Sequence, residues 1–380
     1  MGQQHKHLII VAGEASGDMH AAHLVKALKQ KDTSLVFSGL GGEKMREAGV
    51  DIYYDLTQMA VIGFSEVLKH YNALKKIFNL ILQKCITLKP SAVILIDYPG
   101  FNLRLAQELK KHNIKVIYYI SPQVWAWKKN RVFTIKKCVD AMLVFFQFEK
   151  DFYARYGIPA KFIGNPLIDI VKVTRKKENF LSSVNFDPHK LTIGLLPGSR
   201  DKEIQNLLPL MLQTALLLEK KFQGIQFLLL KAPTIKKDII KKYLKKYHLN
   251  IKLIENNTYN GIHASDFCLV ASGTATLETA ILEKPMVIIY KTSLLTWLLA
   301  KLFVKIPYIG LVNIVAQKRI VPECIQFQAT PQQISQKIES ILKDDNKMAF
   351  MRKELRDVRL SLGEKNSAEK AALKILKVIA

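Results

Sequence analysis

Two acidic segments in the first half of the chain directly follow apolar runs. The segment Gly13–Asp18 (Gly-Glu-Ala-Ser-Gly-Asp) comes after Leu8–Ala12, and Asp97 comes after Val93–Ile96. A carboxylate that is partly shielded from water at the end of a buried strand can act as a general base toward a hydroxyl group. The glycines of the first segment allow a tight turn and the close approach of a ligand. We therefore interpret Asp97 as a candidate base and Gly13–Asp18 as a ligand loop beside it.

The same acidic and hydroxyl side chains also have a purely structural interpretation. Ser16 is placed to cap the helix expected at about 19–30, and Asp18 and Asp97 are residue types that commonly cap helices or stabilise turns. Capping does not require Glu14 as well. Both interpretations stay open for Ser16, Asp18 and Asp97 at the level of sequence.

Two tryptophans, Trp125 and Trp127, lie in the segment Ser121–Trp127 after the apolar run 115–120. Indole rings in a loop that follows a strand can stack on a sugar or line a pocket for an acyl chain. Packing between domains is the structural alternative.

The second half of the chain contains two segments suited to a phosphate-bearing ligand. In Leu195–Arg200, the backbone amides of Gly198 and Ser199 are expected to open toward a ligand. Arg200 adds a planar cation that can bind two phosphate oxygens at once. A surface salt bridge is the structural alternative for Arg200.

The segment Ala271–Glu278 follows a second apolar run and is expected to begin a helix. The N–H groups at a helix start, together with the helix dipole, can bind a diphosphate. Glu278, one turn later, can accept hydrogen bonds from ribose hydroxyls, whereas a well-capped helix is the structural alternative. The candidate ligand contacts in this segment are Ser272, Gly273, Thr274, Ala275, Thr276 and Glu278.

Apolar, β-rich runs alternate with segments of helical periodicity almost throughout the chain. This alternation is typical of an α/β fold with parallel sheets covered on both faces. Eleven strands are too many for one ordinary doubly wound domain, and they divide at about 166–190. We expect domains at 1–170 and 171–350, with a helical tail at 351–380 that can pack back on the first domain. The expected strands are 8–12, 35–38, 92–97, 115–120, 142–146, 161–163, 191–195, 225–230, 251–254, 267–270 and 286–290.

The composition favours a folded protein with an anionic partner. Hydrophobic residues make up 49% of the 380 residues, and the formal net charge is +25. Neither a long apolar segment nor a signal-peptide pattern is present, so we expect a cytoplasmic protein. Its four cysteines are widely spaced, which predicts buried or inert thiols. The basic, amphipathic segment Val67–Leu88 is suited either to ordinary packing or to a membrane surface.

Five segments that occur here in order resemble the lipid-A-disaccharide synthase family of bacterial glycosyltransferases. The resemblance runs from about Leu8 to the final helix and implies the GT-B architecture. That architecture has two Rossmann-like domains whose parallel sheets face a central cleft. The five segments are Ala12–Asp18, Asp97–Asn102, Ser121–Trp127, Leu196–Arg200 and Ser272–Glu278.

The resemblance implies an inverting hexosyltransferase of lipid A and lipopolysaccharide biosynthesis in Gram-negative bacteria. The family transfers 2,3-diacylglucosamine from UDP-2,3-diacylglucosamine to the 6-hydroxyl of 2,3-diacylglucosamine 1-phosphate, which gives a β-1,6-linked disaccharide 1-phosphate and UDP. Asp97 matches the proposed general base, and Arg200 matches an arginine important for activity. Many members carry a second acidic residue three positions after the base; this chain has Gly100, which leaves the base role to Asp97 alone. The residues expected on the acceptor side are Glu14, Ser16, Asp18, Glu66, Asn102, Trp125 and Asn313.

The expected partners are these two acylated substrates and the anionic lipids of the inner membrane. We expect the protein to lie peripherally on the inner face of that membrane, to bind no nucleic acid, and to be able to form a homodimer. No cofactor or metal site is expected, because the UDP-sugar is a substrate and the sequence shows no metal-spaced cluster. The alternatives are another GT-B enzyme of UDP-N-acetylglucosamine, either the peptidoglycan N-acetylglucosaminyltransferase or the 2-epimerase, and a non-catalytic basic protein that binds membranes.

Overall fold

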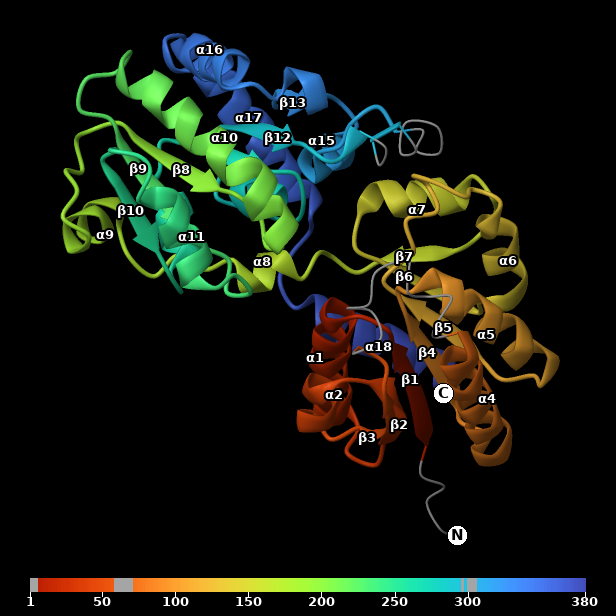
Figure 1. The fold of residues 1–380 in the computed structure, drawn as a ribbon. Helices are drawn as coiled ribbons and strands as arrows, with labels where there is room; N and C mark the ends of the chain where they lie inside the picture. The colour runs from red at the N-terminus through yellow and green to blue at the C-terminus, as the bar shows by residue number, and fades with distance from the viewer. Residues whose placement is uncertain (1–5, 58–70, 295–296, 299–305) are drawn as a thin grey trace. The chain divides into compact units, whose positions relative to one another are not determined.

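The apolar runs form two separate parallel β-sheets in this computed structural model, which describes residues 6–57, 71–294, 297–298 and 306–380 (Figure 1). The first sheet belongs to a unit made of Met1–Pro166 and Leu362–Ala380, and the second to a unit made of Leu167–Ser361. The chain therefore passes from one unit to the other directly after Pro166. Of the tail expected at 351–380, only the part from Leu362 onward belongs to the first unit.

The first sheet has seven strands in the order β3-β2-β1-β4-β5-β6-β7. Sequence analysis identified all of them except β3, an edge strand whose Asp-Ile-Tyr-Tyr-Asp sequence is only half-buried and forms no apolar run. The strands are β1 (His7–Ala12), β2 (Val36–Gly41), β3 (Asp51–Asp55), β4 (Ala92–Ile96), β5 (Val116–Tyr119), β6 (Ala141–Val144) and β7 (Ala160–Phe162).

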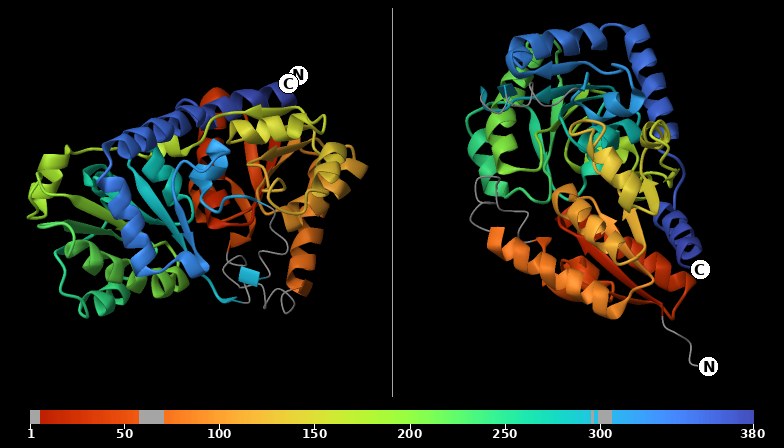
Figure 2. Two further views of the ribbon diagram at one scale, coloured as in Figure 1. Left: turned by 90° about the horizontal axis from the view of Figure 1, so that it is seen from above. Right: turned by 90° about the vertical axis from the view of Figure 1, so that its right-hand side faces the viewer.

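Helices cover both faces of this sheet. Because successive side chains of a strand point to opposite faces, Ile10 of β1 packs in one apolar cluster and Ile9 in another. The first cluster includes residues of α1 and α18, which lie side by side, and the second includes residues of α4 and α5 (Figure 2). The helices of the unit are α1 (Ala15–Lys31), α2 (Glu43–Glu47), α4 (Tyr71–Leu88), α5 (Pro99–Lys111), α6 (Arg131–Cys138), α7 (Gln147–Ala154) and α18 (Ser367–Ile379).

The second sheet has six parallel strands in the order β10-β9-β8-β11-β12-β13. The expected strands 191–195, 225–230, 251–254, 267–270 and 286–290 are present within a residue or two, and the additional β13 is a three-residue edge strand. The strands are β8 (Thr192–Leu196), β9 (Gln226–Leu230), β10 (Ile251–Ile254), β11 (Phe267–Ala271), β12 (Met286–Tyr290) and β13 (Glu323–Ile325).

The helices of the second unit also form two layers. Helix α10 packs with α11, α16 and strand β11, whereas α13 packs with α15 and α17, and α12 packs with α9. The helices are α8 (Leu167–Ile170), α9 (Lys177–Ser183), α10 (Asp201–Glu219), α11 (Lys237–Leu244), α12 (Thr258–Ala264), α13 (Ala275–Ile281), α15 (Leu311–Ala316), α16 (Pro331–Leu342) and α17 (Asp345–Ser361), with a 3₁₀ turn η1 at Gln326–Gln328.

Strand register brings the chemically promising segments together within each unit. In the first unit, Ala12 of β1 pairs with Ile96 of β4, so the loop at Gly13 and Asp97 leave the same sheet edge side by side. In the second, Leu196 of β8 pairs with Val270 of β11. The carboxyl ends of adjacent parallel strands are where ligands bind in open α/β sheets, and both candidate sites lie there.

Two further observations bear on the expectations. The four cysteines are free and buried, as predicted. Across the residues that the structure describes, no helix combines the length and apolar character needed to cross a bilayer. Of the basic segment Val67–Leu88, the part that the structure describes is α4, from Tyr71 onward.

The return of α18 to the first unit should contribute strongly to its stability. Ile375 of α18 is fully buried in the cluster formed with α1. We expect Ile375→Ala to lower the free energy of unfolding by about 2–5 kcal/mol, because it removes apolar contacts and leaves a cavity. Urea unfolding followed by circular dichroism measures this change.

Leu373→Ala on the same helix is the matched control, since Leu373 is 49% exposed. Its effect should stay within roughly 0.5 kcal/mol. Equal effects of the two substitutions would show that α18 is not held against α1.

Candidate functional site

The turn after β4 holds Asp97 in an unusual backbone conformation. Asp97 and Tyr98 both have φ of 43°, in the left-handed region that non-glycine residues rarely adopt. The Tyr118 hydroxyl, from β5, donates to the Asp97 main-chain oxygen at 2.6 Å, and the Asn102 side-chain amide, from α5, donates to it at 2.8 Å. Two neighbouring elements thus hold the turn in place.

The environment of the Asp97 carboxyl suits a general base. Burial raises its pKa, and the Glu14 carboxylate raises it further, to about 6. A base with a pKa near neutrality combines a useful deprotonated fraction with enough basicity to accept a proton. Gly13 permits this arrangement, because a Cβ at that position would clash with the Tyr98 ring.

Glu14 and Ser16 are exposed at the same edge and remain accessible to a ligand. Helix α1 begins at Ala15, four residues before the expected start, and Glu14 occupies its N-cap position without a side-chain hydrogen bond. Of the two interpretations left open for Ser16, this excludes capping, because Ser16 lies inside the first turn. Its hydroxyl stays a candidate contact.

Asp18 has a structural part that the sequence left undecided. Its carboxylate accepts hydrogen bonds from the backbone N–H groups of Gly42 at 2.7 Å, Lys44 at 3.0 Å and Met45 at 3.1 Å. These are the N–H groups at the start of α2, which otherwise lack partners. Both oxygens of this buried side chain already accept hydrogen bonds. We therefore assign Asp18 to the support of the β2–α2 turn rather than to binding of the acceptor substrate.

Asn102 and Asn313 are both fully buried. Asn102 acts through the Asp97 turn, as described above. Asn313 belongs to the second unit rather than to the acceptor side of the first. Its side chain donates to Val321 and Glu323 and accepts from Ile320 and Val321, which makes it a structural tie. Glu66 lies outside the described residues.

Trp125 is held by a buried acid that sequence analysis missed. The indole N–H donates to Glu149 of α7 at 3.3 Å, and the other Glu149 oxygen accepts from the Phe146 N–H at 3.3 Å. The Trp125 ring also meets Phe148 edge to face, with centroids 5.1 Å apart. Burial raises the pKa of Glu149 to about 8. Nothing in the local sequence marks Glu149, since α7 reads as an ordinary amphipathic helix.

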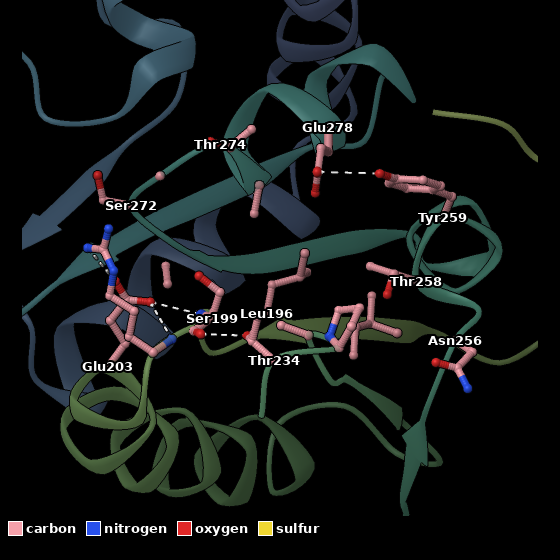
Figure 3. A pocket seen from close by; sticks show the side chains of 18 residues that line it. Leu196, Ser199, Glu203, Thr234, Asn256, Thr258, Tyr259, Ser272, Thr274 and Glu278 are labelled. Atoms are coloured by element: carbon pink, nitrogen blue, oxygen red, sulfur yellow. Dashed lines mark hydrogen bonds and ion pairs between the residues drawn. The ribbon is translucent and has the colours of Figure 1, made fainter. Parts of the chain in front are cut away.

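In the second unit, the carboxyl edge of the sheet opens into a cavity of about 520 Å³ (Figure 3). Pockets of this size commonly bind small molecules. The lining comes from the segments after β8, β9, β10 and β11. It includes all but one of the expected donor contacts, namely Gly198, Ser199, Arg200, Ser272, Gly273, Thr274, Ala275 and Glu278, together with Glu203, Thr234, Asn256, Thr258 and Tyr259.

The loop after β8 differs from expectation in one respect. The N–H groups of Ser199 and Arg200 do not open toward a ligand, because the Glu203 carboxylate accepts from them at 2.8 and 3.3 Å. Gly198, at φ 110°, makes room for this carboxylate, which a Cβ would strike. Arg200 forms the surface salt bridge that was the structural alternative, with Nη1 3.6 Å from Glu203 Oε1. Its side chain is 83% exposed, so the guanidinium can also contact an anion from the solvent side.

Two acid–base groups line the cavity, Glu278 from the segment after β11 and Tyr259 from the segment after β10. The Tyr259 hydroxyl approaches Glu278 Oε1 at 3.5 Å (Figure 3). Burial raises the pKa of Glu278, and burial together with the adjacent Glu278 raises that of Tyr259. Thr276 is the expected contact that does not line the cavity, because it is buried with its hydroxyl donating to the Gly273 oxygen at 2.7 Å.

The sequence is similar to one family of bacterial enzymes over almost its whole length. Residues 8–378 match the family described as lipid-A-disaccharide synthetase. The chain is 42% identical to the lipid-A-disaccharide synthase of Syntrophus aciditrophicus over 375 residues, which cover 98% of each chain. It is 43% identical to lipid-A-disaccharide synthase 1 of Legionella pneumophila over 356 residues, 93% of each chain.

Solved structures with a similar fold are enzymes of sugar nucleotides and glycosyl transfer. The UDP-GlcNAc 2-epimerase from Neisseria meningitidis bound to UDP-GlcNAc has a TM-score of 0.63 at 15% identity, covering 98% of this chain and 100% of that one. The calicheamicin glycosyltransferase CalG4 has a TM-score of 0.62 at 11% identity, covering 99% of both. At such identities the likeness shows the fold alone, and it confirms the expected GT-B class.

The buried Glu149 carboxyl that holds Trp125 should make the stability of the protein depend on pH. Its pKa is about 8 in the folded protein against a usual 4.5. Between these values the folded state keeps a proton that the unfolded chain has released, so this contribution to stability falls as the pH rises. Glu149→Gln keeps the shape without the charge. Its melting temperature should therefore decline less between about pH 5 and pH 8 than that of the wild type.

Asp151→Asn, an exposed carboxylate change on the same helix, is the control and should follow the wild-type curve. Parallel curves for Glu149→Gln and the wild type would contradict the assignment of a protonated Glu149.

Proposed function

The chain belongs to the lipid-A-disaccharide synthetase family, and we propose that it transfers 2,3-diacylglucosamine from its UDP carrier to the 6-hydroxyl of 2,3-diacylglucosamine 1-phosphate. The products are the β-1,6-linked disaccharide 1-phosphate and UDP. The observation that best supports this proposal is the half-buried Asp97 carboxyl, with its pKa of about 6, at the edge of the first sheet. The acceptor would bind to the first unit, and the donor to the cavity of the second.

Asp97 supplies the base that the reaction needs. The 6-oxygen of the acceptor forms a bond to C1 of the donor sugar while the bond from C1 to the diphosphate oxygen breaks. The hydroxyl proton passes to Asp97, and the electron pair of the broken bond leaves with UDP. Attack from the side opposite the leaving group inverts C1 and passes through an oxocarbenium-like transition state.

The cavity of the second unit has groups suited to a nucleoside diphosphate. The exposed Arg200 guanidinium can bind phosphate oxygens in a bidentate manner as charge develops on the leaving group. Glu278 and Tyr259 can hydrogen-bond hydroxyl groups of the ribose. A well-placed hydrogen-bond donor toward developing charge typically lowers the activation free energy by roughly 3–4 kcal/mol. In this proposal UDP departs with the help of these side chains, and no cofactor is needed.

The acyl chains of both substrates make a membrane surface the natural place for the reaction. The proposal therefore includes peripheral association with the inner face of the inner membrane. The net charge of +25 favours anionic lipids, and α4 offers an amphipathic face with Leu80 and Leu88 about two-fifths exposed. Self-association into a homodimer stays a proposal without a described interface.

A direct assay with the purified protein and defined substrates tests the reaction. UDP release from UDP-2,3-diacylglucosamine should depend on added 2,3-diacylglucosamine 1-phosphate, and mass spectrometry should detect the disaccharide 1-phosphate. UDP-N-acetylglucosamine without an acceptor is the control and should be neither hydrolysed nor epimerised. Turnover of that control with no disaccharide formation would favour the epimerase alternative instead.

Replacing the proposed base separates chemistry from binding. Asp97→Asn should lower kcat by about 10²- to 10⁴-fold with little change in the KM for the donor. The wild-type kcat/KM should fall as the pH drops below about 6, because protonation of Asp97 removes the base. Steady-state rates over a range of pH measure both effects.

Asp151→Asn again serves as a control that removes one exposed carboxylate from the first unit. It should retain the wild-type rate and pH profile. Near-normal turnover by Asp97→Asn would assign the base to another group.

A further inference from the structure

Two cations and an exposed tryptophan form a cluster that the proposed reaction has not yet used. Two of its members lie in the segment between β5 and α6 (Figure 1), and the third is the first residue of α6. Trp127 is 40% exposed. The Lys128 ammonium lies 4.7 Å from the centre of its ring, and the Arg131 guanidinium lies 5.4 Å from the same point. We call Trp127, Lys128 and Arg131 the indole cluster.

Within the part of the chain that the structure describes, no carboxylate balances the charge of the indole cluster. No carboxylate in the described ranges forms an ion pair with Lys128 or Arg131, whereas Lys110 on the neighbouring helix α5 pairs with Asp140 at 2.7 Å. Contact with the indole face stabilises the cations only partly, by roughly 0.5–1 kcal/mol at an exposed site. The cluster therefore retains the capacity to bind an anion.

The indole cluster lies on the same sheet edge as the proposed base. Strands β4 and β5 are neighbours, and Ile96 pairs with Tyr119. The Tyr118 hydroxyl bonds the Asp97 main-chain oxygen at 2.6 Å. The pKa of Tyr118 is raised by burial and then by Asp97, and it is lowered by Arg131. Arg131 begins the helix that follows β5, and Asp97 directly follows the neighbouring β4, so both residues come after the carboxyl ends of two paired strands.

The chemistry of the acceptor matches this arrangement. In a glucosamine 1-phosphate, C1 carries the phosphate and C5 carries the CH₂OH group with the 6-hydroxyl. C1 and C5 both bond to the ring oxygen, so the two groups are separated only by that oxygen and their own carbons. A phosphate monoester carries close to two negative charges and three acceptor oxygens. A guanidinium binds such a group bidentately, and an ammonium binds it as a point charge.

We propose that the indole cluster binds the phosphate monoester of the acceptor and thereby orients the 6-hydroxyl toward Asp97. This inference rests on the proposed function, since it names the part of the acceptor that the first unit recognises. The same chemistry occurs in phospholipid headgroups of a bilayer. The acceptor is favoured as the source because the indole cluster follows β5, whose neighbour β4 ends at Asp97, so the cluster and the proposed base leave the same sheet edge.

A comparison of two acceptors tests the assignment. The kcat/KM of the wild type in nonionic detergent micelles is measured with 2,3-diacylglucosamine 1-phosphate and with its 1-O-methyl analogue, which lacks the phosphate. The wild type should prefer the phosphorylated acceptor. Lys128→Ala and Arg131→Ala should each lose roughly tenfold on the phosphorylated acceptor, with little change on the analogue. The KM for the donor should remain unchanged.

Lys137→Ala is the matched control, because Lys137 is an exposed cation on α6 outside the indole cluster. It removes the same charge and should leave the preference for the phosphorylated acceptor intact. Arg131→Lys should restore part of the preference lost in Arg131→Ala, which a folding defect would not explain. Melting temperatures of all variants identify any that fail to fold.

The outcomes separate this inference from the proposed function. A wild type that transfers to neither acceptor would overturn the proposed function. If the wild type transfers the sugar and the variants keep its full preference for the phosphorylated acceptor, only the assignment of the indole cluster as the phosphate site would be overturned. Variants that keep this preference but bind anionic phosphatidylglycerol vesicles less tightly than Lys137→Ala would assign the cluster to a lipid surface instead.

Discussion

The chemistry proposed for the first unit depends on two hydrogen bonds to one main-chain oxygen. Tyr118 and Asn102 both donate to the carbonyl oxygen of Asp97. Without them, two consecutive residues in the left-handed region would be disfavoured by roughly 1–2 kcal/mol each. With them, the Asp97 carboxyl is fixed where burial and Glu14 raise its pKa. A side chain that removes a proton needs both that position and that basicity.

Acidic side chains serve a common structural purpose in both units. Asp18 binds the N–H groups that start α2, and Glu203 binds those of the loop after β8. Glu323 does the same for Ile309 and Gly310. Each carboxylate holds a loop or turn by binding main-chain N–H groups. The formal net charge of +25 leaves an excess of cations for anionic ligands.

Most of the fold could be predicted from the sequence. The strands that are buried on both faces are continuous apolar runs, and such runs identify strands of parallel sheets. The edge strands β3 and β13 were missed because edge strands need no such run; Asp51–Asp55 contains two acids, and Glu323–Ile325 has three residues. The start of α1 was predicted four residues too late because the small and acidic residues up to Asp18 were interpreted as a loop.

In the candidate sites, too, some features follow from the sequence and others only from tertiary contacts. The sequence by itself determined which segments leave the strand ends, because that depends on local pattern and on the order of elements, and it placed Asp97, Arg200 and Glu278 correctly at those ends. Only the tertiary structure decided what each side chain meets. It showed that Asp18 and Asn313 form hydrogen bonds inside their own units, and that Glu149 and Glu203 hold Trp125 and the loop after β8. These outcomes depend on partners that are distant along the chain or on the local backbone path, and neither residue type nor spacing specifies them.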